Sequence, residues 1–311
     1  MKPRPGQIPY LLKEIFFETQ QTDQVYHNES YLHLLALEQP WLSIQQEIEE
    51  IESSEARMYL RSICRPYTRD MITHGISLLN LDQKTNIRDF EKAVFLIGLV
   101  YDPCFDFENF QELLTECENK VRHDLEEKNI NIEELSSDLS REDLSHVAAI
   151  SLRTPLEKVI QSINDIFFKK LDIKGDRHSF FRIESHIPQA LLEGFKTGIQ
   201  LSISSLYIIL GQRLGLPVYG VNLPRHFIAK YETSVFEIFV DPYNQGKITD
   251  RNAILQLLKS YQLKYNAQYT EACSFEVMVK RMIANLTLIF KQQNDNDWVI
   301  FLESISRNEF I

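Results

Sequence analysis

The segment that most constrains the fold is an apolar helix predicted over residues 201–214, followed at once by short strands. Its hydrophobic side chains surround the helix on nearly all sides and form no single stripe. A helix of this kind is buried on most sides, because any face turned to water would expose apolar surface. It ends at Gly215-Leu216-Pro217, where glycine suits the position just past a helix and proline prevents its continuation. Other elements must therefore pack around this helix.

Helical patterns dominate the rest of the chain. A periodic apolar run ends at Asp102-Pro103, and a longer helix is predicted over residues 107–127. Residues 129–145 are polar and serine-rich, which is typical of an exposed loop or a poorly packed helix. Thr154-Pro155 carries the capping threonine and the proline of a helix start. Three further helices are predicted at 254–259, 275–291 and 298–305.

These patterns predict an α+β protein with three regions. The first is a mostly helical N-terminal region over residues 1–172. The second is a core over residues 173–250 that contains the buried helix and a small antiparallel sheet. The third consists of C-terminal helices over residues 251–311, which we expect to pack on the core.

The composition limits which classes of binding partner and which cellular location are expected. The net charge is -11, whereas nucleic acid and anionic membranes both attract basic surfaces, so neither is expected as a partner. No apolar run approaches the length of a membrane-spanning helix, and the N-terminus does not resemble a signal peptide. The four cysteines show neither disulfide nor zinc spacing. We therefore expect a soluble cytoplasmic protein without a cofactor or metal.

Two strands with alternating side chains follow the helix, over residues 226–231 and 235–241. A two-residue turn at Thr233-Ser234 would make them an antiparallel hairpin. In that register the core face pairs Phe227 with Val240, Ala229 with Ile238, and Tyr231 with Phe236. The other face pairs His226 with Asp241, close enough for the carboxylate to orient the imidazole ring.

Residues 198–246 resemble the core of the transglutaminase-like superfamily, and in particular its divergent bacterial SirB-type branch. The similar pieces are GIQLSIS, LGQRLGLPVYGVNLPRHF and VDPYNQG, and weaker likeness extends over residues 90–298. The resemblance implies a papain-like core in which a cysteine starts the buried helix and a histidine and an aspartate follow on adjacent strands. These positions hold Gln200, His226 and Asp241 here. The SirB-type branch generally lacks that cysteine.

Each candidate residue has a functional and a structural interpretation. Gln200 is either part of a retained binding pocket or a polar residue that satisfies backbone groups at a helix end. His226 and Asp241 either polarise a water or ligand, or simply join two strands. The candidate rim of the cleft consists of Ser202, Asn222, Arg225 and Asn244.

The leading hypothesis is a non-catalytic relative of the superfamily that binds an unknown protein or peptide. A glutamine side chain offers no nucleophile, so no catalytic residue is assigned. The alternative is a hydrolase or acyltransferase that uses Ser202 or an activated water with His226 and Asp241. A metal site at His178, Glu184 and His186 is a weaker hypothesis, because their spacing matches no metal motif.

Overall fold

The structure is a computed structural model that describes residues 65–103, 105–264 and 266–307. The chain divides into two compact units, Met1–His74 with Asp102–Asp106, and Gly75–Tyr101 with Phe107–Ile311. All candidate site residues lie in the second unit. The part of the predicted helical N-terminal region that precedes residue 65 lies outside the described residues.

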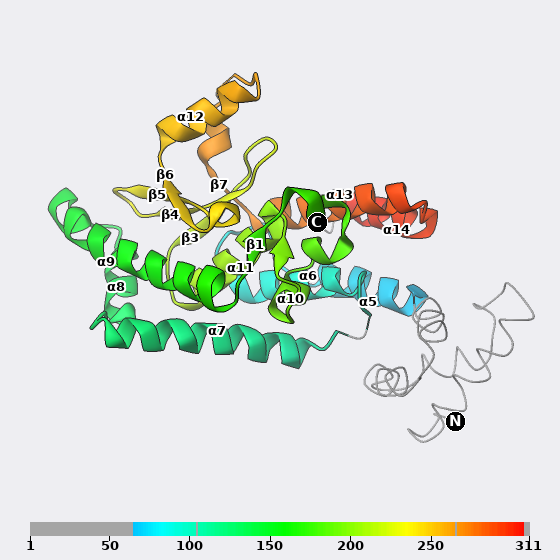
Figure 1. The fold of residues 1–311 in the computed structure, drawn as a ribbon, viewed down its shortest axis with the longest axis horizontal. Helices are drawn as coiled ribbons and strands as arrows, with labels where there is room; N and C mark the ends of the chain where they lie inside the picture. Colours follow the sequence, from blue (N-terminus) through cyan, green and yellow to red (C-terminus); the bar gives the residue numbers. More distant parts are fainter. Residues whose placement is uncertain (1–64, 104, 265, 308–311) are drawn as a thin grey trace, which may run out of the picture. The chain divides into compact units, whose positions relative to one another are not determined.

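Helices make up most of the described chain (Figure 1). The α-helices are α5 (Arg65–Ser77), α6 (Ile87–Gly98), α7 (Phe107–Glu127), α8 (Ile132–Leu139), α9 (His146–Asn164), α10 (Pro188–Leu192), α11 (Gln200–Arg213), α12 (Arg251–Ser260), α13 (Phe275–Gln293) and α14 (Asn296–Arg307). A π-helix, η3 (Asp165–Lys170), continues α9, and the 3-10 helices are η4 (Arg177–Phe181), η5 (Ile183–His186), η6 (Pro242–Asn244) and η7 (Ala267–Thr270).

A five-stranded antiparallel sheet has the order β6-β5-β4-β3-β7. Its strands are β3 (Val218–Val221), β4 (Ile228–Glu232), β5 (Glu237–Asp241), β6 (Lys247–Thr249) and β7 (Ala272–Cys273). A separate parallel pair joins β1 (Lys174–Gly175) to β2 (Thr197–Gly198). The predicted α+β class, with a buried helix and a small antiparallel sheet, is confirmed.

Helix α11 is the buried helix predicted from the sequence. Every residue from Leu201 to Gly211 is buried. Strands β3 and β4 and helices α6, α7 and α10 all contact α11. Gly211 permits the close approach of the sheet, because a Cβ atom there would collide with Val218. Side chains on this face of the sheet, including Tyr231 and Val240, are fully buried.

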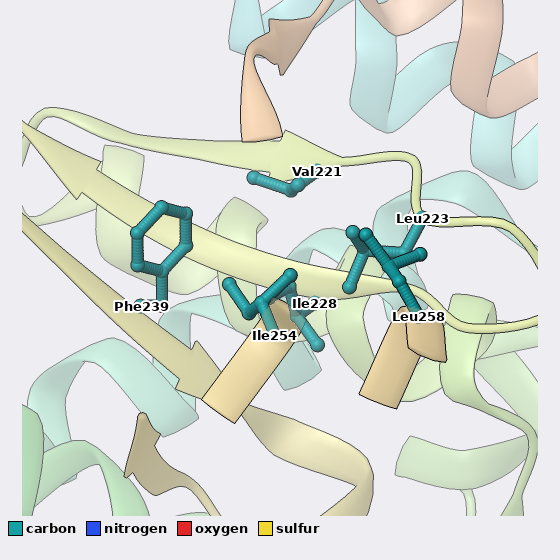
Figure 2. Close-up of a cluster of buried hydrophobic side chains, with 6 residues drawn as sticks. All are labelled: Val221, Leu223, Ile228, Phe239, Ile254 and Leu258. Atoms are coloured by element: carbon teal, nitrogen blue, oxygen red, sulfur yellow. The ribbon is translucent and has the colours of Figure 1, made fainter. Parts of the chain in front are cut away.

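The opposite face of the sheet is covered by α12. Figure 2 shows Ile254 and Leu258 of α12 against side chains of the three central strands and of the loop that follows β3. The members of this cluster are Val221, Leu223, Ile228, Phe239, Ile254 and Leu258. The sheet is therefore a middle layer, with α12 on one side and α11 on the other (Figure 1).

The register of β4 and β5 differs from the predicted one by two residues. Ala229 is paired with Val240, and Tyr231 with Ile238. The turn contains four residues, because the Thr233 hydroxyl accepts hydrogen bonds from the backbone N–H groups of Val235 and Phe236, at 3.3 and 3.0 Å. A shift of two residues leaves each side chain on its predicted face, so the division into a core face and an opposite face holds.

The helix start predicted at Thr154 is wrong, and of the two alternatives predicted for residues 129–145 the structure shows a helix, which is better packed than expected. Helix α9 begins at His146, eight residues before Thr154, because the Ser145 side chain caps it by accepting from the Ala148 N–H. Pro155 accordingly lies inside this helix. The polar segment before it contains α8, whose Ile132, Leu135 and Leu139 are buried. Three apolar residues at helical spacing are enough to dock a short helix.

Candidate functional site

Gln200 is the first residue of α11, at the position where the resemblance places a nucleophile. The preceding Ile199 has extended backbone and offers no side-chain cap. Gln200 is half-buried, and no hydrogen bond joins it to His226 or Asp241, all three of which are described. Its side chain is an amide, which is too weak a nucleophile for covalent catalysis.

The hydroxyl groups of the α11 serines donate hydrogen bonds to backbone carbonyl groups. Ser202 is 1 % exposed, and its hydroxyl lies 2.6 Å from the Ser185 carbonyl oxygen and 3.1 Å from that of Ile199. Ser204 and Ser205 are also buried, and each hydroxyl donates to a main-chain oxygen. A serine nucleophile needs its hydroxyl directed at a base. The geometry therefore does not favour the alternative in which Ser202 acts with His226.

His226 and Asp241 are in direct contact, as predicted. Nε2 of the ring lies 2.7 Å from Oδ2 of Asp241, and both side chains are largely buried. The reason differs from the predicted one, because the observed register places Asp241 level with Ile228. His226 precedes β4 in a turn closed by its own N–H, which donates to the Leu223 carbonyl oxygen at 3.1 Å. The ring crosses diagonally to the carboxylate, within the reach of a long side chain.

Asp241 accepts hydrogen bonds from Asn244 as well as from His226. Its Oδ2 also accepts from the Asn244 side-chain amide at 2.6 Å, and its Oδ1 accepts from the Asn244 backbone N–H at 3.2 Å. Burial by itself raises the pKa of Asp241, but the hydrogen bonds from His226 and Asn244 outweigh it and hold the pKa below its usual value. The carboxylate is therefore ionised and fixed in position.

The ring of His226 has a defined tautomer. A carboxylate only accepts hydrogen bonds, so Nε2 donates to Asp241, and in the neutral ring Nδ1 carries the lone pair. Nδ1 has no hydrogen-bond partner among the described residues. The edge of the ring packs against Tyr243, with 6.2 Å between the ring centroids. The ring is thus oriented as a base would be, but no nucleophilic side chain in the part of the chain that the structure describes is hydrogen-bonded to it.

Arg281 of α13 was not predicted as a site residue. Its guanidinium donates to the carbonyl oxygens of Leu223 and His226, at 3.1 and 3.0 Å, and to the side chain of Asn222. Burial lowers the pKa of Arg281. The only sequence signal is an arginine among apolar residues of a helix, with Met278 and Met282 buried beside it. Its carbonyl partners cannot be identified from a pattern, because they lie 55 and 58 positions away.

The remaining rim candidates surround this pair. Asn222, Arg225 and Asn244 are exposed, whereas Ser202 is buried and is therefore not a rim residue. Arg225 has a left-handed backbone, with φ of 62°, and its guanidinium lies 5.8 Å from the centre of the Tyr261 ring. Asn244 belongs to the pair rather than to the rim alone, through its two bonds to Asp241.

Asn164, the last residue of α9, packs against the turn that follows Asp241. Gln245 and Gly246 have φ of 58° and 70°, and the Asn164 amide donates to the Gly246 carbonyl oxygen at 3.0 Å. A Cβ atom at Gly246 would collide with the Asn164 side chain. Next to this contact lies a small cavity of about 350 Å³, lined partly by Asn164, Gln245 and Gly246. Packing by Asn164 thus fixes the end of the turn that carries Asn244.

The described thiols are buried and protonated, and the described residues contain no group of metal ligands. Burial raises the pKa of Cys117 to about 11 and that of Cys273 to about 12, so both thiols are protonated at neutral pH. Nε2 of His186 lies 2.7 Å from the Phe180 carbonyl oxygen, to which it donates. Within the described ranges, no group of three or more His, Cys, Asp or Glu side chains is placed to hold a metal ion. Nor does any described helix have the length and hydropathy needed to cross a bilayer.

Comparisons with curated proteins give distant relatives. A human protein named F-box only protein 21 is 24 % identical over 158 residues, which cover 48 % of this chain and 24 % of that protein. A UPF0162 protein of Xylella fastidiosa is 24 % identical over 160 residues, covering 50 % of this chain and 55 % of the relative. A UPF0162 protein of Vibrio cholerae is 26 % identical over 125 residues, covering 39 % and 46 %. The chain thus spans about a quarter of the human protein and about half of the bacterial ones.

The chain matches a protein family but no solved structure. No solved structure gives a significant match to the chain. The family described as the transglutaminase-like superfamily matches residues 108–284, which is more than half of the chain and includes α11 and the whole sheet. The chain belongs to the transglutaminase-like superfamily.

Proposed function

We propose that this protein is a non-catalytic member of the superfamily, of the SirB-type branch, that binds a protein or peptide. The binding site is the relict cleft, defined as Gln200, His226 and Asp241 with the exposed side chains of Asn222, Arg225 and Asn244. The observation that carries the proposal is the amide of Gln200 at the start of α11, next to serine hydroxyls that donate to main-chain carbonyls. No described side chain is placed to attack a substrate with help from His226.

The contacts of the pair support a role in shaping a surface. The hydrogen bond between His226 and Asp241 joins the turn before β4 to η6. Arg281 holds the turn before β4 through hydrogen bonds to two carbonyl groups. Arg225 lies in this anchored turn with a left-handed backbone, a conformation that persists only where the surroundings enforce it. Residues presented by a rigid support lose little entropy on binding, which favours recognition. The proposal includes a cytoplasmic location, where free thiols such as Cys117 and Cys273 stay reduced.

A restored thiol tests whether Gln200 occupies the position of the missing nucleophile. Gln200→Cys puts a thiol at a helix N-terminus, and on the proposed placement of residue 200 beside the His226 ring we expect the pKa of this thiol to fall below the usual value of about 8.5. The measurement is the pH dependence of alkylation by iodoacetamide, with the parent chain as background. Adding His226→Ala should return the pKa towards its usual value. An ordinary pKa that does not respond to His226→Ala would show that the scaffold does not place residue 200 beside the ring.

Two further experiments test the absence of catalysis and the binding role. Serine-reactive and cysteine-reactive probes should give no labelling of the wild type that depends on His226, and such labelling would contradict the proposal. In an affinity pull-down with the intact chain, a partner should be lost from the variant with Gln200→Ala and His226→Ala. The same partner should be kept by Lys259→Gln, an exposed lysine of α12 outside the cleft. Retention of every partner by the cleft variant would place recognition elsewhere.

A further inference from the structure

A hollow of about 500 Å³ lies at the far end of α11 from Gln200. Its lining comes from three helices and includes Arg88, Glu91 and Lys92 of α6, Phe107 and Gln111 of α7, and Arg213 of α11. Gln200 and Arg213 are the first and last residues of α11, and the rise of 1.5 Å per residue separates them by about 20 Å. The hollow is thus distinct from the relict cleft. Its volume is in the range of small-molecule sites.

The floor of the hollow is a fixed polar network. Arg213 donates to both carboxylate oxygens of Glu91, at 2.6 and 3.0 Å, although Glu91 is only 4 % exposed. Gln111 donates to Glu91 at 3.0 Å and accepts from Arg213. The charge of Glu91 is therefore neutralised by Arg213 within the floor. The carboxylate has little attraction left for the cations at the opening of the hollow.

Those cations are Arg88 and Lys92, one helical turn apart on α6. Both are exposed, and neither forms an ion pair with any described residue. The charged lining amounts to three positive side chains and one negative one, in a chain with a net charge of -11. Two unpaired cations four residues apart on a helix repel each other, and an anion between them would relieve that repulsion.

One wall of the hollow is aromatic. Phe107 is half-buried and lines the hollow beside Gln111. Its ring is held edge-on to Phe95, with 5.1 Å between the ring centroids. A ring held in this way presents a fixed apolar surface to whatever enters the hollow. The site therefore combines free positive charge with a flat apolar contact.

We propose that this hollow binds a small organic anion whose charged group is attached to an aromatic or other flat apolar body. Arg88 and Lys92 hold the charged group, which is a phosphoryl group or a carboxylate. Phe107 contacts the apolar body. The Glu91–Arg213 network keeps the three helices at the spacing that the ligand needs.

The test is calorimetric titration of the intact chain with phenyl phosphate, benzoate, inorganic phosphate and benzyl alcohol. Phenyl phosphate or benzoate should bind saturably and more weakly as salt is raised. The stronger of the two identifies the charged group. The variant with Arg88→Gln and Lys92→Gln should bind at least about tenfold more weakly, the loss expected for charge-assisted contacts. Both side chains are exposed and unpaired, so this variant should keep the wild-type melting temperature.

The matched control is Lys259→Gln, which removes an exposed helical lysine without an ion pair among the described residues. It should bind the anion as the wild type does. Three results would overturn the proposal. They are absence of saturable binding by both aryl anions, equal affinity in the double variant, and binding of benzyl alcohol as tight as that of the anions.

Discussion

Asp241 accepts hydrogen bonds from three donors, which are the ring of His226, the side-chain amide of Asn244 and the backbone N–H of Asn244. Each donor comes from a segment outside β5, so one carboxylate fixes two turns at the end of the sheet. This is a sufficient structural reason for the acid–imidazole pair, independent of any catalytic role. The presence of His226 and Asp241 is therefore compatible with the proposed absence of catalysis at residue 200.

The first prediction concerns the pH dependence of stability. The folded-state pKa of Asp241 lies below its usual value of 3.8, so its ionised form stabilises the folded state. This contribution is complete above pH 3.8 and is lost as the pH falls through the lower folded-state value. Asp241→Asn should lower the free energy of unfolding by about 2 kcal/mol at neutral pH, the scale for hydrogen bonds to a charged group.

The measurement is urea denaturation of both proteins at a series of pH values. The difference in the free energy of unfolding between wild type and Asp241→Asn should be largest at neutral pH and should disappear below pH 3.8. A gap that stays constant down to strongly acidic pH would show that the pKa of Asp241 is not lowered by folding.

At the scale of elements, the hairpin of β4 and β5 depends on the turn at Thr233. Its hydroxyl accepts from two backbone N–H groups and donates to the Phe236 carbonyl oxygen at 3.1 Å. A threonine that satisfies the backbone in this way makes a four-residue turn as good as a two-residue one. The turn, more than the strands, decides the register, since both registers place the same residues in the core.

We therefore predict that Thr233→Ala destabilises the protein by about 1 kcal/mol, the typical net value of a side-chain hydrogen bond. Thr233→Ser is the matched control, because it keeps the hydroxyl and removes only a methyl group. Chemical denaturation measures both effects. Equal losses in the two variants would show that the hydroxyl has no role in the turn.

The turn after η6 also depends on a single residue, Gly246, for its conformation. Gly246 combines a positive φ with close packing against Asn164, so Gly246→Ala adds backbone strain and a steric clash. We expect a loss of about 2 kcal/mol or more, since strain of this kind alone costs 1–3 kcal/mol. Gly194→Ala is the control, because its φ is also positive but no atom lies within 4 Å of the new Cβ. A smaller loss at Gly246 than at Gly194 would contradict the packing argument.

Patterns local in the sequence predicted these elements better than contacts between distant segments. Burial all round α11 and the alternation of β4 and β5 were sufficient to predict the core face, whereas the contact of His226 with Asp241 was predicted from a register that differs from the observed one by two residues. The start of α9 was missed because a serine cap and a mid-helix proline compete as signals, and the cap at Ser145 determines the boundary. Arg281 was missed because its main-chain partners have no sequence signature.

At the scale of the whole molecule, helices from all three predicted regions pack together. Helix α11 contacts α6 and α7, and α6 contacts α13. The pair of Glu91 and Arg213 connects α6 to α11 through two hydrogen bonds at a buried position. The boundaries predicted after residues 172 and 250 stay predictions. These contacts lead us to expect that the second unit unfolds in one transition.

The buried pair tests this coupling. Glu91→Ala leaves Arg213 without its main partner, and we expect a loss of about 3 kcal/mol, the scale for breaking a buried ion pair. Glu91→Leu combined with Arg213→Met should cost less than the sum of the two single changes, because no unpaired charge remains. Urea denaturation monitored by circular dichroism gives these values. Strict additivity would show that the two side chains are not coupled.

The two edges of the sheet limit how a peptide can dock. The edge strands β6 and β7 contain only three and two residues, and β6 begins with the exposed Lys247. Because these edge strands are so short, and one of them carries a lysine, a bound peptide could form very few backbone hydrogen bonds by adding a strand to the sheet. The proposed peptide partner must therefore be recognised mainly through its side chains. Selectivity should follow the chemistry of those groups, and replacing backbone amides of a bound peptide by N-methyl groups should change its affinity little.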